Sequence, residues 1–593
     1  MTIREHGMQL LIQILINKKQ PIKNPPLIQN DEILYESQSI ANAFNDYFIN
    51  LFNSSNSTEM LFKKYMKQSN SASFYLEPTN PLELIHHAKT LSNSSTLDLH
   101  LISNKVLKII IYPISNILSS LFNKIIISGI YPNSLKISKV IPIHKKDSIH
   151  DASNYRPISI VPCFSKLLEK IIKLKLDNFL NKHNILSNLQ FGFRKDRSTE
   201  DAIIKFVNDV VNNINNNYYT LALFIDFSKA FDCINHQILI SKLTHHGIRG
   251  LPLQLLESYL MNRSQYVTIN NINSKTSLIT SGVPQGSVLG PLLFNIFISD
   301  ILNITNICKF IIFADDCTLY TRSLDITDLA NKLNISLAHI EDWSNLNKMS
   351  INYNKTKYMQ FNCKKITTLV NLPININDHT IEKVDCFRLL GVYLDNKLNF
   401  KHHIDQILTK ININLSIIRR IKPFLNLKTC KILYYSLFYS HFYYCNIIWG
   451  GANKTDIDQI YNAQKKIVKI LFFKNPYKQI TNLNLFNENQ ILSIFEINKF
   501  KSCLLIHKIL YLPNSFHALH IILFSFNIFN HSHHIRSLDN YLIKPILPKN
   551  KLSQRNFQFY GILYWNNLPS YLRLNNNFIE FKKTLKEFLI CQS

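Results

Sequence analysis

An apolar segment that ends at two adjacent acids is the strongest constraint on the fold of this chain. Phe310–Phe313 is apolar, Asp315 and Asp316 follow after one alanine, and Cys317–Tyr320 alternates in character. This order predicts a β-hairpin with both acids at or beside its turn. Adjacent carboxylates repel each other, and tight hairpin turns usually take Asn-Gly or Asp-Gly, so the pair is a poor choice for stability alone. A bound cation would explain it, because Mg²⁺ is held by one or two carboxylates together with substrate phosphates.

A second apolar run also ends at an acid. Leu221–Ile225 is continuously apolar, as is typical of a strand covered on both faces, and Asp226 follows it. Taken alone, Asp226 is better interpreted as the N-cap of a following helix. Together with Asp315 and Asp316, however, it gives three carboxylates from two adjacent strands. Such a set could hold two metal ions about 3.5–4 Å apart, which would stabilise the attacking and leaving oxygens of an in-line phosphoryl displacement.

The amino-acid composition narrows the classes of molecule that this chain could bind. The 593 residues are 46% hydrophobic, which excludes a wholly disordered chain, and the length predicts two to four domains. There are 66 Lys and Arg against 39 Asp and Glu, a formal net charge of +27. This surplus fits a nucleic-acid backbone or an anionic membrane surface, and biased codon usage is a third explanation. Apolar stretches such as 504–529 are interrupted by Lys, Pro and His, so we expect buried helices, no membrane partner, and a nucleic acid as ligand.

Neither a zinc site nor a disulfide framework is expected. The ten cysteines are scattered without a C-x-x-C pair, which favours a reducing compartment. His531-Ser-His-His534 could bind a metal, but no cysteine pattern accompanies it.

The pattern of elements changes along the chain. Residues 1–95 are polar and broken by prolines, with one helical pattern at Ile40–Phe52. Apolar helical runs begin near residue 100, as in Leu99–Ile127. From Val140 to about Tyr393 short apolar strands alternate with helices, which predicts an α/β or α+β core.

The last third of the chain is different again. Residues 401–473 return to helical patterns rich in Lys, Tyr and Ile. Residues 480–593 are basic and carry few helical patterns, with prolines at 545, 548 and 569. We expect the first of these regions to be a helical domain and the second an extension of unknown role.

Seven short sequence blocks stand in order over about residues 137–395: Asn154–Ser159, Gln190–Arg194, Asp226–Asp232, Ser281–Pro291, Phe313–Asp316, Asn354–Thr356 and Leu389–Tyr393. In this order they resemble the motifs of reverse transcriptases from non-LTR retrotransposons, and the jockey-like group is the most similar. A single F-A-D-D block would be a weak signal. Seven blocks in order identify the chain as similar to that family.

The resemblance implies an α+β, right-hand polymerase fold. We expect an N-terminal extension or linker over 1–95, fingers and an antiparallel palm sheet over 96–395, a helical thumb over 396–480, and a basic C-terminal extension over 481–593. Both extensions are expected to be helical. The upstream endonuclease domain that is usual in this group does not fit into the first 95 residues, so we expect it to be lost or separately encoded.

The resemblance also assigns roles at the expected active site. Asp226, Asp315 and Asp316 would hold two Mg²⁺ ions, with Mn²⁺ as an alternative, and Lys355 would be the general acid for the leaving pyrophosphate. Lys357 is a second candidate for that acid, and either lysine could equally be an ordinary surface residue.

Other residues would bind the nucleotide. Phe231 stands where the family has a bulky ring that excludes a 2′-hydroxyl, although it could be an ordinary core residue; Asp232 is more simply structural. Lys145, Lys146 and Arg156 would bind the triphosphate, since Arg and Lys suit phosphate oxygens, or they could form a solvated basic loop.

The glycine-containing loop and three further positions complete the predicted site. Gln285 and Gly286 would contact the nucleotide and Gly282 the template, since glycine allows close approach of a backbone; a plain turn before a helix is the alternative. Arg194 would contact the template, as could Arg197, and Leu390 and Gly391 would hold the primer end. A thumb rich in Lys and Tyr, with tyrosines at 434, 435, 439 and 443, would follow the duplex through its backbone.

The expected function is an RNA-directed DNA polymerase that copies a retrotransposon RNA from a primer in target DNA. Its partners would be an RNA template, a DNA primer and dNTPs, and a nuclear location is expected from this role alone. A catalytically inactive or domesticated RNA-binding descendant is the alternative. An RNA-dependent RNA polymerase is disfavoured by Phe231 and by Ala314, where such enzymes usually have glycine.

Overall fold

The computed structural model describes residues 26–29, 32–50, 60–361, 374–376, 379–473, 482–512, 542–543 and 548–592. The chain divides into two compact units, each built from separate stretches of sequence. Unit 1 contains the described residues within Met1–Phe193, Asp226–Asn306 and Ser336–Asn352. Unit 2 contains those within Arg194–Ile225, Ile307–Ile335 and Tyr353–Ser593. The His531–His534 segment lies outside the described residues.

The centre of unit 2 is a five-stranded sheet in the order β14-β11-β5-β10-β9. Its strands are β5 (Tyr219–Ile225), β9 (Lys309–Phe313), β10 (Asp316–Ser323), β11 (Lys357–Phe361) and β14 (Glu382–Lys383). β5 pairs antiparallel with β10 and β11, and every one of its residues is buried. The prediction of a strand covered on both faces over 221–225 is therefore confirmed.

Helix α6 (Thr199–Asn215) packs against β5 and β9 of this sheet. A capping box fixes its start: Asp201 N donates to Ser198 Oγ, and Ser198 N donates to the Asp201 carboxylate. A separate hairpin of β15 (Cys386–Leu389) and β16 (Val392–Asp395) follows the sheet in the chain.

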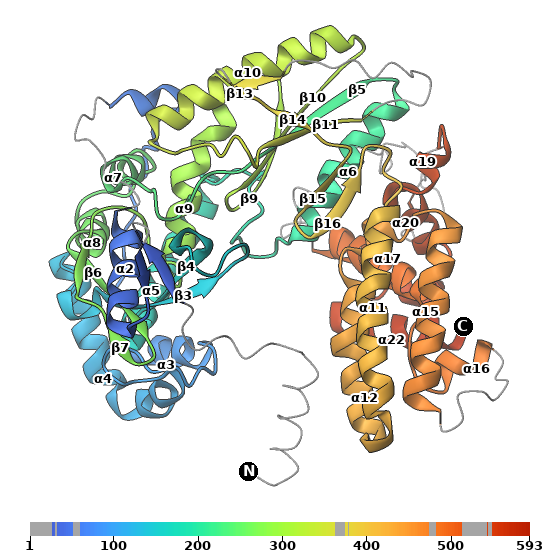
Figure 1. Cartoon of the computed structure of the whole chain (residues 1–593), viewed down its shortest axis with the longest axis horizontal. Coiled ribbons are helices and arrows are strands. Elements are labelled where there is room, and N and C mark those ends of the chain that lie inside the picture. Colours follow the sequence, from blue (N-terminus) through green and yellow to red (C-terminus); the bar gives the residue numbers. More distant parts are fainter. Residues whose placement is uncertain are drawn as a thin grey trace. The chain divides into compact units, whose positions relative to one another are not determined.

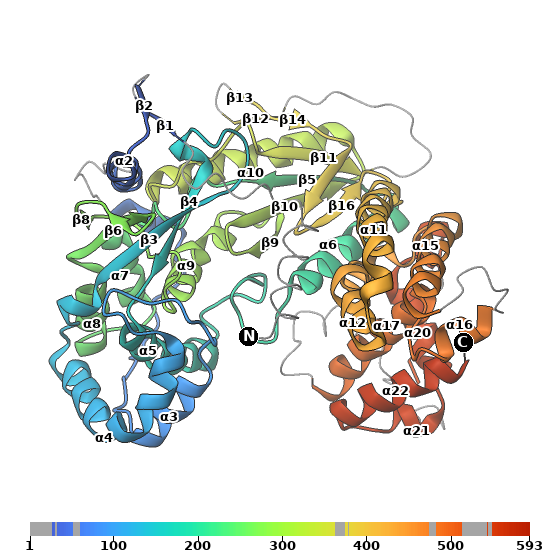
Figure 2. The same ribbon diagram turned by 60° about the horizontal axis from the view of Figure 1, so that its bottom comes forward.

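From residue 401 onward the described part of unit 2 is helical, as Figures 1 and 2 show in orange to red. α11 (Lys401–Ile421) and α12 (Leu427–Tyr434) both contact α15 (Lys454–Phe472). α15 contacts α17 (Ile494–Tyr511), which also packs on α20 (Phe557–Asn566) and α22 (Phe578–Gln592). The prediction of few helices from the pattern of residues 480–593 is thus wrong for the described residues, which are helical as the resemblance implied. Proline positions misled it, because Pro569 lies just before a helical turn, where proline is tolerated.

Unit 1 contains a second mixed sheet in the order β4-β3-β6-β7, with β8 also paired to β6. Its strands are β3 (Ile137–His144), β4 (Tyr155–Ile160), β6 (Arg263–Ile269), β7 (Ile272–Asn273) and β8 (Ser277–Ile279). Helix α2 (Ser37–Ile49) packs on β6, β7 and β8 through its buried phenylalanines. It matches the helical pattern expected over 40–52, except that residues 51 and 52 are not described.

Helices surround this sheet in unit 1 (Figure 2). α4 (Asn104–Ser128) begins at the Ser103 cap and ends at Gly129, whose φ of 67° suits a glycine. It contacts α3 (Pro81–Lys89), α5 (Cys163–Lys182) and α8 (Leu251–Leu260). Among the described residues, α4 alone is long and apolar enough to span a membrane by length and composition.

Candidate functional site

The β9–β10 hairpin places two carboxylates at its tip. Asp316 pairs with Phe313, so Ala314 and Asp315 form a two-residue turn, as the sequence predicted. Ala314 has a φ of 57°, and a left-handed conformation costs a residue with a Cβ roughly 1–2 kcal/mol. Asp315 and Asp316 are both exposed. Strained turns of this kind are concentrated at functional sites, which supports a role for the two acids beyond stability.

Asp226 directly follows the strand that pairs with this hairpin. Ile225, the last residue of β5, lies opposite Cys317, the second residue of β10. Phe227, the next residue, forms an antiparallel bridge to Ile351, and residues 228–232 then form a turn. The next helix, α7 (His236–His245), begins at an Asn235 cap, so the alternative of Asp226 as its N-cap is wrong.

The donor set of these three acids fits a divalent cation. Carboxylate oxygens suit Mg²⁺ and Mn²⁺. In the described part of the chain no three Asp, Glu, His or Cys side chains already form a metal-binding group. Mg²⁺ typically takes only one or two carboxylates and completes its shell with substrate phosphates and water. The residues therefore suit metal ions that bind together with a nucleotide, and the two-ion site stays a prediction.

In unit 1, the glycine-containing loop at 281–290 is fastened to the segment that follows Asp226. Gln285 Nε2 donates to both carboxylate oxygens of Asp232, at 2.9 Å each. Gly282 has a φ of 79°, and a Cβ there would lie 2.7 Å from the Asp232 carbonyl oxygen. Gly286 has a φ of 134°, and a Cβ there would lie 2.3 Å from the Ser159 carbonyl oxygen. Both glycines are thus required by close backbone approach within the protein itself.

Asp232 sits in a setting that disfavours its charge. Burial raises the pKa of Asp232 to about 6, although the Gln285 hydrogen bond and nearby Lys229 act in the opposite direction. Burial also lowers the pKa of Lys229, whose ammonium lies over the Tyr47 ring. Asp232 and Gln285 help line a cavity of about 40 Å³ that also borders Ser159.

Phe231 is packed between two other rings. It stacks on Phe294 with ring centroids 4.5 Å apart, and the edge-on Phe193 ring lies 5.9 Å away. The residue is half-buried, so its packing against these two rings fixes its position without burying it completely. This packing accommodates both interpretations of the residue, a core phenylalanine and a steric gate.

The comparisons with known proteins agree with this geometry. Residues 143–394 match the profile of the family described as reverse transcriptase (RNA-dependent DNA polymerase). This segment of the chain is a reverse transcriptase domain. It includes the β9–β10 hairpin, Asp226 and the 281–290 loop, and the motif core expected over 137–395 nearly coincides with it.

Similar proteins come from insect mobile elements. The chain is 25% identical over 481 residues to the probable RNA-directed DNA polymerase from transposon BS of Drosophila melanogaster, covering 77% of this chain and 52% of that protein. It is 28% identical over 387 residues to the polymerase from mobile element jockey of the same species, covering 62% and 41%. For the probable polymerase from transposon X-element the identity is 26% over 441 residues, covering 72% and 47%. The chain thus spans about half the length of these relatives.

In the reverse transcriptase domain, the three predicted phosphate-binding residues lie on one hairpin of unit 1. Arg156 in β4 pairs with Ile143 in β3, and Lys145 and Lys146 begin the loop between the strands. All three side chains are exposed. Lys146 Nζ is 3.6 Å from the exposed Asp147 carboxylate, an ion pair of little energetic weight. The hairpin brings these cations together, and their contact with a triphosphate stays a prediction.

The two lysines considered as general acid differ in their surroundings. Lys355 is exposed in the turn that precedes β11. Lys357, in β11, forms an ion pair with Glu382 of β14. An ammonium paired in this way is a poorer proton donor to a leaving group, which argues against Lys357. The role of Lys355 as general acid stays a prediction.

Leu390 and Gly391 form the two-residue turn of the β15–β16 hairpin. Both have positive φ, 44° and 89°, as a type I′ turn requires. Arg194 and Arg197 lie in the segment before α6, and burial lowers the pKa of Arg197. Their contacts with a template or primer stay predictions.

A buried acid that sequence reasoning missed supports the 281–290 loop. Glu169 in α5 accepts hydrogen bonds from Val288 N at 2.6 Å and Leu289 N at 3.1 Å. Its other oxygen accepts from Ser165 Oγ at 3.0 Å. Burial raises the pKa of Glu169, while fully buried Arg263 acts in the opposite direction. The sequence signal that could have identified Glu169 was an acidic residue on the apolar face of a helix.

Proposed function

We propose that this chain is an RNA-directed DNA polymerase of the non-LTR retrotransposon type. The observation that carries the proposal is the strand register that ends with Ile225 opposite Cys317, because Asp226 is the next residue of one strand and Asp316 the preceding residue of the other. The strained turn with Asp315 adds a third acid. Right-hand fingers, palm and thumb would correspond to the β3–β4 hairpin region, the β5-centred sheet and the α11–α15 helices.

Asp226, Asp315 and Asp316 would hold two divalent ions, Mg²⁺ or Mn²⁺. When bound, such ions neutralise charge on the triphosphate and lower the pKa of an attacking hydroxyl. Lys355 would hold the proton that passes to the leaving pyrophosphate. Since nearly all of the catalysis of phosphoryl transfer comes from positioning and electrostatics, the protein's main task is to orient primer and nucleotide.

The nucleotide would be held by residues of unit 1. Lys145, Lys146 and Arg156 would bind its phosphates, and Phe231 would exclude a ribose 2′-hydroxyl. Because Gln285 Nε2 is occupied by Asp232, its remaining polar atom Oε1 can only accept a hydrogen bond. Gln285 would therefore meet a donor group of the nucleotide or template.

The partners would be an RNA template, dNTPs and a DNA primer supplied by the target site. The net charge of +27 supports a nucleic-acid partner, since Lys and Arg that neutralise phosphates release counterions. The similar Drosophila proteins from transposon BS and mobile element jockey are named as a probable RNA-directed DNA polymerase and an RNA-directed DNA polymerase.

Primer extension on an RNA template tests the proposal. We expect the full chain to extend a DNA primer with dNTPs and Mg²⁺, and to use NTPs poorly. Asp315→Asn should reduce the rate by at least about 10²–10³-fold, the usual cost of removing one group that stabilises transition-state charge. Asp405→Asn, on an exposed acid of α11, is the matched control and should leave the rate unchanged.

Three results would contradict the proposal. Incorporation of NTPs alone would indicate an RNA polymerase. RNA binding without extension would indicate an inactive descendant. Full activity of Asp315→Asn would show that the Asp315 carboxylate does not hold a catalytic metal ion.

A further inference from the structure

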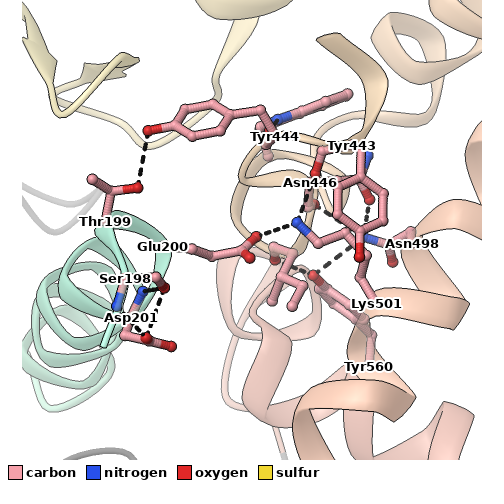
Figure 3. A network of polar contacts seen from close by, with 12 residues as sticks. Ser198, Thr199, Glu200, Asp201, Tyr443, Tyr444, Asn446, Asn498, Lys501 and Tyr560 are labelled. Carbon is pink, nitrogen blue, oxygen red and sulfur yellow. Dashed lines mark hydrogen bonds and ion pairs between the residues drawn. The ribbon is translucent and has the colours of Figure 1, made fainter. Parts of the chain in front are cut away.

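The turn formed by Leu390 and Gly391 is held by a tyrosine from a distant part of unit 2. The Tyr444 hydroxyl donates to the Leu390 carbonyl oxygen at 2.5 Å. The same hydroxyl shares a hydrogen bond of 3.1 Å with Thr199 Oγ1 (Figure 3). Its ring lies against the turn, since a Cβ on Gly391 would be 3.2 Å from Tyr444 Cε1. One side chain thus connects the β15–β16 hairpin to the first residue of α6.

The backbone that carries Tyr444 is bent in a way that needs support. The next residue, Cys445, has a φ of 51°, an unfavourable conformation for a residue with a Cβ. It lies between two short helices, α13 (Ser440–Tyr443) and α14 (Asn446–Trp449). Trp449 Nε1 donates to the Tyr444 carbonyl oxygen at 2.9 Å and closes this bend.

Helix α17 supplies the support from the C-terminal region. Lys501 Nζ donates to the Tyr443 carbonyl oxygen and to Glu200 Oε1, both at 2.6 Å (Figure 3). Asn498 Nδ2 donates to the carbonyl oxygen and Oδ1 of Asn446, at 3.1 and 2.9 Å. Both sides of the bend are therefore fixed by a single helix, and the same lysine also reaches α6.

These polar contacts matter because packing between α6 and α17 is incomplete here. A cavity of about 290 Å³ lies beside them, lined by the first turn of α6 and by Tyr443, Lys501 and Leu504. The side chain of Lys501 is only 6% exposed and that of Glu200 22%. Lys501 is thus nearly buried while Glu200 stays partly exposed beside the cavity, so losing the Glu200 carboxylate would leave the Lys501 ammonium with the Tyr443 carbonyl oxygen as its hydrogen-bond partner.

We infer that Tyr444 is a positioning residue for the primer end, and that α17 sets its position through Lys501 and Asn498. This inference rests on the proposed function, which assigns the Leu390–Gly391 turn to the primer. The C-terminal region, whose role the sequence did not reveal, would then be a structural part of the polymerase. Tyr444 acts through the turn and touches no reacting atom.

The test compares Tyr444→Phe with a matched control in the full chain. Tyr444 is 41% exposed, so removing its hydroxyl should leave the fold intact. We expect kcat for addition of one dNTP to fall about 10–100-fold, because small misplacements of reacting groups are costly, while the KM for dNTP stays unchanged. Tyr571→Phe, an exposed tyrosine of α21 (Ser570–Arg573), should leave both constants unchanged. Lys501→Met should act in the same direction as Tyr444→Phe, and Lys501→Arg should restore part of the rate.

A second measurement separates this inference from the proposed function. Amide hydrogen exchange should become faster across 386–395 in Tyr444→Phe but not across β5. Unchanged kcat and unchanged exchange in Tyr444→Phe would overturn the inference while the polymerase activity stands. If the wild-type chain extends no primer, the proposed function fails and the primer assignment fails with it, whereas the exchange result still decides whether Tyr444 holds the turn. A fall in kcat matched by an equal change for Tyr571→Phe would also overturn it.

Discussion

Gln285 Nε2 lies 2.9 Å from both carboxylate oxygens of Asp232. An ionised carboxylate is only an acceptor, so this contact fixes which way the Gln285 amide faces. The same two segments are joined through the backbone, where Val283 N donates to the Phe231 carbonyl oxygen at 3.0 Å. The segment after Asp226 and the glycine-containing loop are therefore joined by side-chain and backbone hydrogen bonds within unit 1, and protonation of Asp232 would convert one of the two acceptor oxygens of this contact into a donor.

The first prediction concerns pH. Burial raises the pKa of Asp232 to about 6, so the carboxylate that orients Gln285 predominates only above that pH. We expect kcat/KM for dNTP to fall as pH decreases through about 6. In Asp232→Asn, which cannot titrate, this step should disappear from a pH profile measured between pH 5 and 8. An identical step in the variant would assign the titration to another group.

The ionisation of Asp232 affects the stability of the fold in the opposite direction: we expect it to favour activity but to disfavour folding. Since the folded-state pKa lies above the unfolded value of 3.8, the fold is favoured most when Asp232 is protonated. Its contribution to the free energy of unfolding is complete below about pH 4 and is lost as pH rises through about 6. Denaturant unfolding at pH 4 and 7 measures the free energies of unfolding of the wild type and of Asp232→Asn. We expect the variant to be the more stable protein at pH 7, and the difference between the two to be smaller at pH 4.

The second prediction concerns sugar selection by Phe231. Its ring is fixed by stacking on Phe294, so a smaller side chain should open space without displacing the backbone. Phe231→Ala should raise the ratio of NTP to dNTP incorporation by at least about tenfold, as expected for changing the shape of an apolar pocket. Phe231→Tyr keeps the ring and should retain the wild-type ratio. An unchanged ratio of NTP to dNTP incorporation in Phe231→Ala would show that Phe231 is a core residue and not a steric gate.

Local signals in the sequence predicted local structure well. The apolar run before Asp226 and the apolar run before Asp315 are both strands, and the two-residue turn between β9 and β10 is where the acids indicated. These features depend on neighbouring residues, because turn chemistry and strand burial act over a few positions. The N-cap interpretation of Asp226 failed because Asn235, nine residues later, is the actual cap.

Contacts between distant and individually ordinary residues could not be predicted. Lys501 and Glu200 are 301 positions apart, and nothing in either local sequence indicates the other. Glu169 likewise looks like one acid among apolar helix residues until the loop at 288–289 is seen to donate to it. Such partners are chosen by topology, so a single sequence carries little information about them.

The third prediction concerns stability in unit 1. Lys242 and Asp300 form a fully buried ion pair with Nζ 2.8 Å from Oδ1, and Trp343 Nε1 also donates to Oδ1 at 3.0 Å. Removing one partner of a buried pair typically costs about 3–5 kcal/mol, because the other charge is left unpaired. Lys242→Met should therefore lower the free energy of unfolding by about that amount. The double variant Lys242→Met/Asp300→Asn should recover part of it, with unfolding followed by tryptophan fluorescence; no recovery would show that lost packing dominates.

The last prediction concerns Glu169, whose carboxylate accepts backbone hydrogen bonds from the 281–290 loop. Its two accepted backbone hydrogen bonds satisfy Val288 N and Leu289 N just before α9 (Gly290–Ile298), where a helix leaves such groups unpaired. Glu169→Leu would leave both groups unsatisfied, at about 1–3 kcal/mol each, and should destabilise the protein and raise the KM for dNTP through a displaced Gln285. Glu169→Gln retains one acceptor oxygen at the same place and removes the buried charge, so its KM should stay near the wild-type value. Equal KM values for the two variants and the wild type in primer extension would show that Glu169 supports folding alone and leaves the nucleotide loop unaffected.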